Sequence, residues 1–139
     1  MITVIDYGMG NIRSVVKAVE RYTERVRVSQ DPSSIETSDA LIMPGDGAFG
    51  KAMENLRELK WIDPLRDFIR NDGYFLGICL GYQLMFSTSE EFGRHNGLDI
   101  IPGDVVRFNT PGLKVPHMGW NEVEITGDSR FLEGITSPS

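Results

Sequence analysis

Short apolar runs that alternate with helix-patterned segments constrain the fold of this chain more than any other feature. The runs lie at residues 2–6, 26–29, 40–43 and 74–78 and are rich in apolar side chains. Strands of this kind are typical of a parallel sheet that helices cover on both faces. The sequence therefore predicts an α/β fold with an open, mostly parallel sheet and helices on both of its faces.

Capping residues and apolar spacing predict the helices between these strands. Asn11 can cap a helix whose apolar residues share one face. These residues are Ile12, Val15, Val16, Val19 and Tyr22. A second helix is expected over residues 49–59, and a third opens with Asp63 as N-cap and Pro64 at the first helical position, ending at residues 71–73.

The chain changes character after the fourth apolar run, residues 74–78, which we expect to be a buried strand. A helix is predicted through "GYQLMF", residues 81–86, and a polar, loop-like segment from Ser87 to Gly97. Alternating residues then predict half-exposed strands at 104–108 and 121–125. No repeat or linker divides the sequence, so we expect residues 1–139 to form a single domain.

Composition narrows the class of protein. The net charge of −6 and the lack of clustered Lys and Arg argue against a nucleic-acid partner. No apolar stretch approaches the roughly 20 residues that span a bilayer. The single cysteine cannot form an internal disulfide, and the N-terminus lacks a signal-peptide pattern. We therefore expect a protein of the reducing cytoplasm that is not in a membrane.

Cys79 is the single cysteine, and two interpretations of it stay open at this point. A lone cysteine after an apolar strand is commonly a core residue. However, Gly77 and Gly81 flank it at two residues on either side, as small residues flank the nucleophile at a sharp strand-to-helix turn. A thiol there would lie at a helix N-terminus, which favours the thiolate, and the next amide could help hold an oxyanion.

The turn at residues 44–47, "PGDG", follows another apolar strand. Loops after the carboxyl ends of parallel strands line the ligand crevice of such sheets, so this turn and Cys79 should converge. Its glycine amides could approach an oxyanion, although an ordinary turn is the alternative. "DYGMGN", residues 6–11, lacks the third glycine and the lysine of phosphate loops, so we do not expect nucleotide binding there.

The histidines offer no evident base and no metal site. His95 lies in a polar segment, where we expect it to be solvated. His117 lies in "KVPHMGWNEV", and nothing local orients its imidazole toward Cys79. No group of His and Cys residues has ligand spacing, so neither a metal nor another cofactor is expected.

The sequence resembles the class I (Cys-His-Glu) glutamine amidotransferases. Their motif G-x-C-x-G-x-Q is matched by Gly77, Cys79, Gly81 and Gln83. Together with it, "VIDYGMGNIRSV", "PGDGAF", "SEE" and "VPHMGWNEV" are similar to the glutaminase subunits of imidazole glycerol phosphate synthase, an enzyme of histidine biosynthesis. The resemblance implies a flavodoxin-like fold and a heterodimer with a (β/α)8-barrel cyclase subunit, which would use the ammonia released from glutamine.

The resemblance also implies a role for each matched residue. Cys79 would attack the glutamine carboxamide and form a glutamyl thioester. The oxyanion hole would comprise Gly45, Asp46, Gly47 and Leu80. Gln83 and Glu91 would hold the substrate glutamine. The partner interface would comprise Pro116, His117, Met118, Gly119 and Trp120, and we expect Trp120 and the segment around His117 to form a partially exposed apolar surface rather than core. The side chain of Asp46 should point away from the oxyanion, because a carboxylate there would oppose the developing charge.

The family takes its catalytic histidine and glutamate from a His-x-Glu motif near the C-terminus, and no histidine follows His117 here. We therefore expect a chain that lacks the C-terminal third of the fold and does not turn over glutamine by itself. The alternatives are a non-catalytic remnant that retains partner binding, and the glutaminase of another pathway, such as pyridoxal phosphate synthesis.

Overall fold

The computed structural model describes residues 1–127, 132 and 134. Residues 1–107 form one compact unit, called the main unit below, and residues 108–139 form a second. Each unit is described by itself, and the expectation that all 139 residues form one domain stays a prediction. Among the described residues, no helix has both the length and the apolar character needed to cross a membrane.

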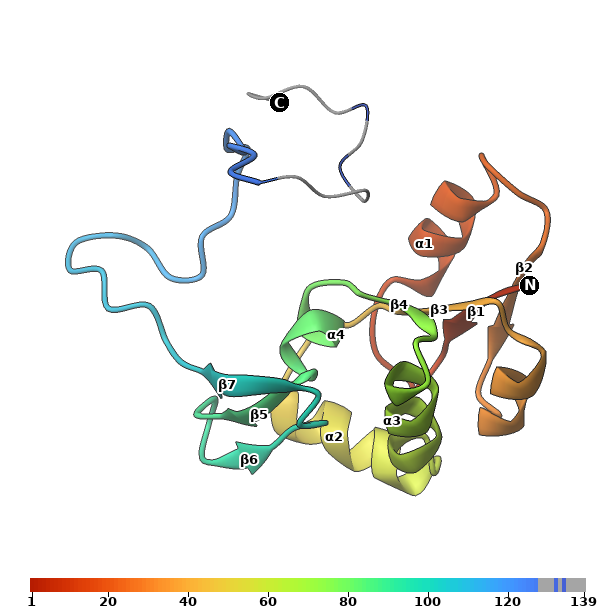
Figure 1. Ribbon diagram of the computed structural model, residues 1–139. Coiled ribbons are helices and arrows are strands. Elements are labelled where there is room, and N and C mark those ends of the chain that lie inside the picture. Colours follow the sequence, from red (N-terminus) through yellow and green to blue (C-terminus); the bar gives the residue numbers. More distant parts are fainter. Residues whose placement is uncertain (128–131, 133, 135–139) are drawn as a thin grey trace. The chain divides into compact units, whose positions relative to one another are not determined.

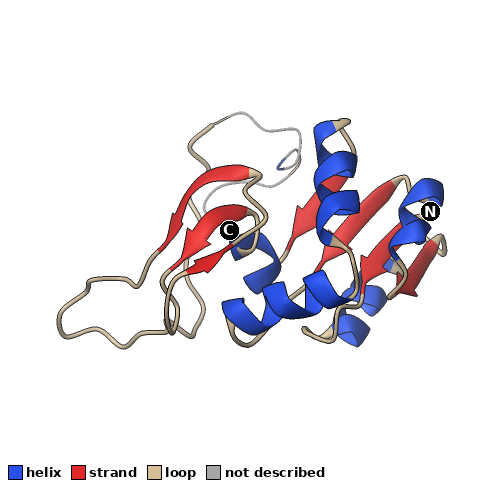
Figure 2. Cartoon of the chain, turned by 90° about the horizontal axis from the view of Figure 1, so that it is seen from below, coloured by secondary structure: helices blue, strands red, loops and turns tan. Residues whose placement is uncertain are grey.

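A four-stranded parallel sheet organises the main unit. Its strands are β1 (Ile2–Ile5), β2 (Val26–Ser29), β3 (Ala40–Met43) and β4 (Tyr74–Gly77). The spatial order is β2-β1-β3-β4, and all three pairings are parallel. Figure 2 shows the four strands side by side. All four strands predicted from the apolar runs are confirmed.

Helices lie on both faces of this sheet. They are α1 (Ile12–Val19), the 3-10 helix η1 (Pro32–Thr37), α2 (Phe49–Glu58), α3 (Ile62–Arg70) and the short α4 (Leu80–Gln83). Figure 1 shows α1 on one face, and α2 and α3 on the other, as predicted. The predicted cap of α1 is also confirmed, because the side chain of Asn11 accepts a hydrogen bond from the Ser14 amide at 3.2 Å.

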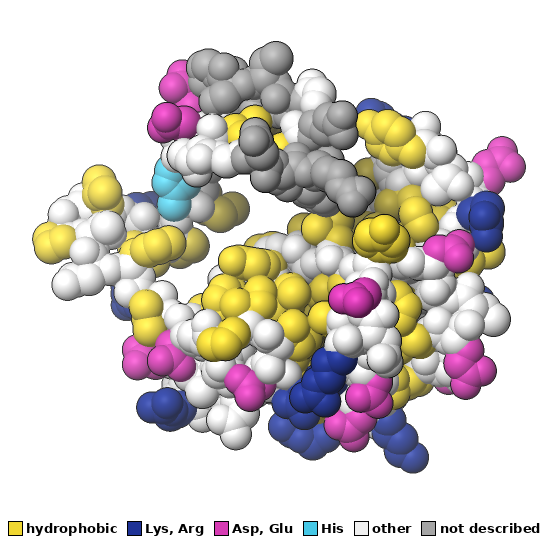
Figure 3. Space-filling model, viewed as in Figure 1, with side chains coloured by type: hydrophobic (Ala, Val, Ile, Leu, Met, Phe, Trp, Pro, Cys, Tyr) yellow, Lys and Arg dark blue, Asp and Glu magenta, His cyan; other side chains and the backbone are white. Residues whose placement is uncertain are grey.

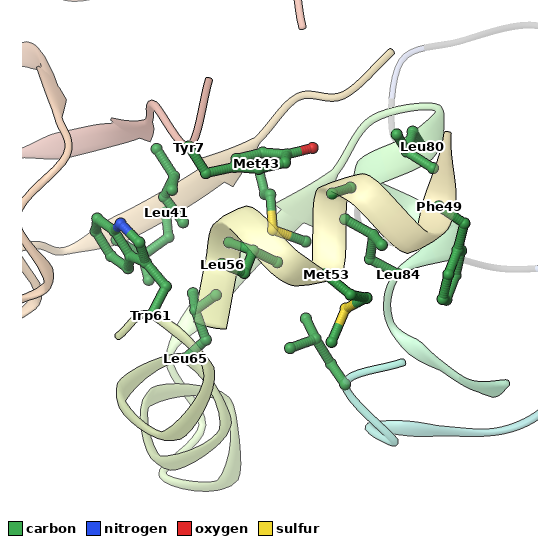
Figure 4. Close-up of a cluster of buried hydrophobic side chains, with 13 residues drawn as sticks. Tyr7, Leu41, Met43, Phe49, Met53, Leu56, Trp61, Leu65, Leu80 and Leu84 are labelled. Atoms are coloured by element: carbon green, nitrogen blue, oxygen red, sulfur yellow. The ribbon is translucent and has the colours of Figure 1, made fainter. Parts of the chain in front are cut away.

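The core lies between the sheet and helices α2, α3 and α4 (Figure 4). The strands contribute Ile5, Leu41 and Met43, and α2 contributes Phe49, Ala52, Met53 and Leu56. Trp61 links α2 to α3 and is fully buried, and its indole N–H donates to the Gln30 carbonyl at 3.1 Å. These contacts fix α2, and therefore the loop that precedes it, against the carboxyl end of β3.

A small second sheet follows α4 and corrects two predictions. Its strands are β5 (Phe86–Ser89), β6 (His95–Asn96) and β7 (Ile101–Val105), in the order β6-β5-β7. The helix predicted through residue 86 ends at Gln83, because the carbonyls of Leu84 and Met85 accept bonds from the later amides of Leu98 and Ile101. The segment predicted as a loop, residues 87–97, contains β6 and all of β5 except Phe86.

Three further expectations were wrong. Asp63 is not a helix cap but lies in the first turn of α3, which begins earlier because the buried Trp61 takes the N-cap position. The strand predicted over residues 121–125 is absent from the described chain, where that segment is coil. The strand predicted over residues 104–108 begins instead at Ile101 and ends at Val105.

The expectation that β4 is buried was also wrong. In the described structure β4 pairs with β3 alone and forms an edge of the sheet. Tyr74 is therefore 79% exposed. Apolar side chains are likewise open to the surface over the middle of the view in Figure 3.

Candidate active site

Three loops converge where neighbouring parallel strands end. Residues 6–11 follow β1, residues 44–48 follow β3, and residues 78–79 follow β4. Met43 pairs with Gly77 at the ends of β3 and β4, and the Ile78 amide continues this pairing by donating to the Met43 carbonyl at 3.0 Å. The last two of these loops were expected to meet at this edge, because parallel strands bring their carboxyl ends together.

Cys79 occupies the sharp turn predicted between β4 and α4. It is the N-cap of α4, its backbone has φ +55° and ψ −117°, and the residue is exposed. An L-residue rarely adopts this conformation, and such strain is common at functional sites. The core interpretation of Cys79 is therefore wrong, and the exposed thiol is available for reaction.

Glycines are required on both sides of this turn. A Cβ at Gly81 would overlap the carbonyl oxygen of Met43, and one at Gly77 would lie 2.8 Å from the Gly81 carbonyl oxygen. The first turn of α4 thus lies directly against the end of β3. Because α4 is a single turn, the macrodipole expected from the sequence is small. The amides of Gly81 and Tyr82 already donate to the Ile78 and Cys79 carbonyls, so the Leu80 amide is the one this turn offers to an oxyanion.

The loop at residues 44–47 packs against Leu80 and carries one carboxylate that accepts a hydrogen bond. Gly45 is buried, and a Cβ there would lie 2.9 Å from the Cβ of Leu80. Asp46 is exposed, and its Oδ1 accepts a hydrogen bond from the Gly10 amide at 2.9 Å. The side chain of Asp46 is therefore held by the loop after β1.

Tyr7 is the residue of this site that the sequence interpretation missed. It is 1% exposed, and its hydroxyl donates to the Pro44 carbonyl at 2.8 Å. Burial raises the pKa of Tyr7 well above its usual value, and the charges of Asp46 and Cys79 raise it further. The strand order indicates this residue: β1 lies next to β3, so the loops that follow the two strands meet at one edge of the sheet.

The two residues expected to hold substrate lie on different elements. Gln83 ends α4, one helical turn after Cys79, and is exposed. Glu91 lies between β5 and β6, and its Oε2 accepts a hydrogen bond from the Phe49 amide at 2.6 Å. This bond caps the start of α2, so Glu91 ties the β5–β6 connection to the end of the 44–48 loop.

Neither histidine is placed by a hydrogen bond to Cys79 among the described residues. His95 is half-buried in β6, and a Cβ at Gly50 would lie 2.7 Å from its ring, so the expectation of a solvated side chain was wrong. His117 lies in the second unit and is exposed. The described chain also holds no cluster of three or more His, Cys, Asp or Glu residues suited to a metal ion.

The segment expected to face a partner is exposed in its own unit. Met118 is 84% exposed and Trp120 is 103% exposed, while Pro116, His117 and Gly119 are also exposed. The predicted exposure of Trp120 is therefore confirmed.

The sequence is similar to known amidotransferases over most of its length. Residues 7–111 match the family described as CobB/CobQ-like glutamine amidotransferase domain. Similar proteins include the imidazole glycerol phosphate synthase subunit HisH of Syntrophotalea carbinolica, 47% identical over 99% of this chain and 69% of that protein. The HisH subunit of Rhodopirellula baltica is 49% identical over 90% of this chain and 62% of the relative.

A third relative and one solved structure agree with these matches. The HisH subunit of Methanothermobacter thermautotrophicus is 48% identical over 96% of this chain and 66% of that protein. A crystal structure of a glutamine amidotransferase has a TM-score of 0.68 and 22% identity, covering 82% of this chain and 59% of the other. The structural match supports the fold alone. The chain thus spans about two thirds of the length of its curated relatives.

Proposed function

Since this chain belongs to the HisH family of imidazole glycerol phosphate synthase subunits, within the glutamine amidotransferases, we propose that its complete subunit hydrolyses glutamine for histidine biosynthesis. The observation that carries this proposal is the exposed Cys79 thiol on its strained turn, beside the 44–47 loop. The side chain of a nucleophile at such a turn projects from the tip of the turn, where it can reach a bound carboxamide.

The proposed reaction proceeds through a thioester. The Cys79 thiolate adds to the carboxamide carbon of glutamine, which places a negative charge on the carboxamide oxygen. The amides of Leu80 and of residues 45–47 stabilise this charge. The C–N bond then breaks, ammonia leaves with a proton from a general acid, and water hydrolyses the glutamyl thioester to glutamate and the free thiol.

Gln83 and Glu91 are the proposed contacts of the substrate's amino-acid end. Glu91 is exposed and uses Oε2 for the Phe49 amide. We assign its carboxylate to the ammonium group of glutamine, which matches its charge. The resemblance places the general base and acid in a His-x-Glu motif that these 139 residues do not contain, so the assay requires the complete subunit.

We propose that a cyclase subunit of (β/α)8-barrel type receives and uses the ammonia. The two subunits would form a heterodimer that carries out a lyase reaction. The segment 116–120 would provide part of its interface. The proposed thioester chemistry needs a reduced thiol, and the cytoplasm maintains one. The similarity to HisH subunits does not favour the glutaminase of another pathway.

The test compares wild type and Cys79→Ala in the complete subunit, assembled with the cyclase subunit. Glutamine hydrolysis should fall by about 10⁴-fold or more in the variant, because no other group forms the thioester. Cyclase activity supplied with ammonium salt should be unchanged, which shows that the complex is intact. Glutamine hydrolysis within tenfold of wild type would overturn the assignment of Cys79 as nucleophile.

A further inference from the structure

The hydroxyl of Tyr7 lies beneath the loop that carries the proposed oxyanion hole. It donates to the Pro44 carbonyl at 2.8 Å, and a Cβ at Gly45 would lie 2.5 Å from it. The ring packs in the core, where Figure 4 shows it beside Met43 with its hydroxyl directed toward the end that holds Leu80. A buried hydroxyl placed in this way fixes the position of the Pro44 carbonyl to which it donates.

The atom that Tyr7 holds determines where a neighbouring amide points. The Pro44 carbonyl and the Gly45 N–H belong to one planar peptide group, and in a trans peptide they point in opposite directions. Because the carbonyl is turned toward Tyr7, the Gly45 N–H points away from the Tyr7 hydroxyl, and this orientation is fixed while the hydrogen bond is made. A rotated peptide would leave the buried Tyr7 hydroxyl without its acceptor, which costs about 1–3 kcal/mol.

Tyr7 is itself held in place, so it can act as a rigid support. The side-chain amide of Asn55, on α2, donates to the Tyr7 carbonyl at 3.0 Å. Three residues later, a Cβ at Gly10 would lie 3.0 Å from the Gly45 nitrogen. The loop after β1 therefore contacts the 44–47 loop at two points, beneath Pro44 and beside Asp46, where Gly10 donates its amide.

We propose that Tyr7 is a positioning residue that fixes the Pro44–Gly45 peptide and, with it, the conformation of the 44–47 loop that carries the proposed oxyanion hole beside Cys79. This inference rests on the proposed function and adds a residue from the loop after β1 to that site. Tyr7 does not contact the reacting atoms itself. The raised pKa of Tyr7 is consistent with this role, because the hydroxyl stays protonated and can donate wherever the enzyme operates.

The first test is Tyr7→Phe in the complete subunit with its cyclase. The substitution keeps the buried ring and removes only the hydroxyl. We expect kcat for glutamine hydrolysis to fall about 10-fold to 100-fold with KM within twofold, since loss of a whole oxyanion donor typically costs 10²–10³. Tyr22→Phe is the matched control, because Tyr22 is 90% exposed, and its kcat should equal that of wild type.

A second measurement separates positioning from a general structural effect. Iodoacetamide alkylates Cys79 by displacing iodide and forms no oxyanion, whereas a chloroketone analogue of glutamine places its carbonyl oxygen in the oxyanion hole. Tyr7→Phe should slow the chloroketone by the same factor as kcat and leave iodoacetamide alkylation within twofold. Equal slowing of both reagents would indicate a merely structural role and overturn the inference.

The outcomes also distinguish this inference from the proposed function. Full activity in Tyr7→Phe beside an inactive Cys79→Ala would overturn the inference alone. Glutamine hydrolysis that persists in Cys79→Ala would overturn the proposed function itself. Slowed turnover and a slowed chloroketone reaction, with normal iodoacetamide alkylation, would support both.

Discussion

Cys79 has a backbone conformation that suits glycine better than any residue with a side chain. Its φ of +55° and ψ of −117° place the Cβ in a crowded position, and such strain costs about 1–3 kcal/mol. The chain keeps a cysteine there because only a residue with a side chain can present a thiol. The cysteine at this position therefore makes the protein less stable than a glycine in the same conformation would.

This strain predicts the effect of two substitutions at the same position. Cys79→Gly removes the crowded Cβ, while Cys79→Ala keeps it, and both remove the thiol. The greater conformational freedom of glycine in the unfolded chain lowers the stability of the glycine variant by about 0.5–1 kcal/mol and so offsets part of the strain that it relieves. We therefore expect Cys79→Gly to be more stable than Cys79→Ala by about 1 kcal/mol. Urea unfolding of the two variants measures the difference. Equal stabilities, or a more stable alanine variant, would show that the turn is not strained.

The elements of the site depend on a close approach between α4 and β3. Gly81 is buried, and its Cα faces the Met43 carbonyl without room for a methyl group. This contact sets the distance between Cys79, at the start of α4, and the 44–47 loop, at the end of β3. The short helix is thus placed by backbone packing and by its two core residues, Leu80 and Leu84.

Gly81→Ala should therefore push α4 away from β3. We expect a loss of about 2–3 kcal/mol in the free energy of unfolding, the upper part of the roughly 1–3 kcal/mol that overpacking typically costs. Gly127→Ala is the matched control and should change stability little, because nothing in the described part of the chain lies within 4 Å of a Cβ there. Both values come from urea titrations. A Gly81→Ala protein as stable as the control would contradict the close packing described for α4.

At the scale of the whole molecule, the described part of the second unit contributes an exposed surface rather than core. Phe108, Leu113, Met118 and Trp120 are each at least 72% exposed. A large aromatic side chain that is fully exposed contributes little to the stability of its own unit. Exposed aromatic residues of this kind are enriched among those that dominate binding energy at interfaces.

Trp120→Ala should weaken binding of the complete subunit to its cyclase while leaving stability unchanged. We expect the Kd to rise at least about 30-fold, corresponding to the roughly 2 kcal/mol of an interface hot spot. Titration calorimetry measures the Kd, and Tyr22→Ala serves as the control, because Tyr22 is 90% exposed and lies outside the segment. An unchanged Kd for Trp120→Ala would remove Trp120 from the proposed interface.

The sequence by itself determined the features that depend on neighbouring residues. Apolar runs located the four strands, Asn11 marked the start of α1, and the glycines around Cys79 predicted its sharp turn. Each of these follows from the local sterics of a few adjacent residues. The convergence of the Cys79 turn with the 44–47 loop also followed, because parallel strands end at the same edge of a sheet.

Only the tertiary structure decided the features that depend on residues far apart in the chain. Helix α4 ends early because later amides bond to the carbonyls of Leu84 and Met85. Glu91 caps α2 across 42 positions, and Tyr7 reaches Pro44 across 37. Local patterns could not reveal these partners, because a buried hydrogen bond between distant residues leaves no periodicity in the sequence and forms only when the packed core brings the two groups together.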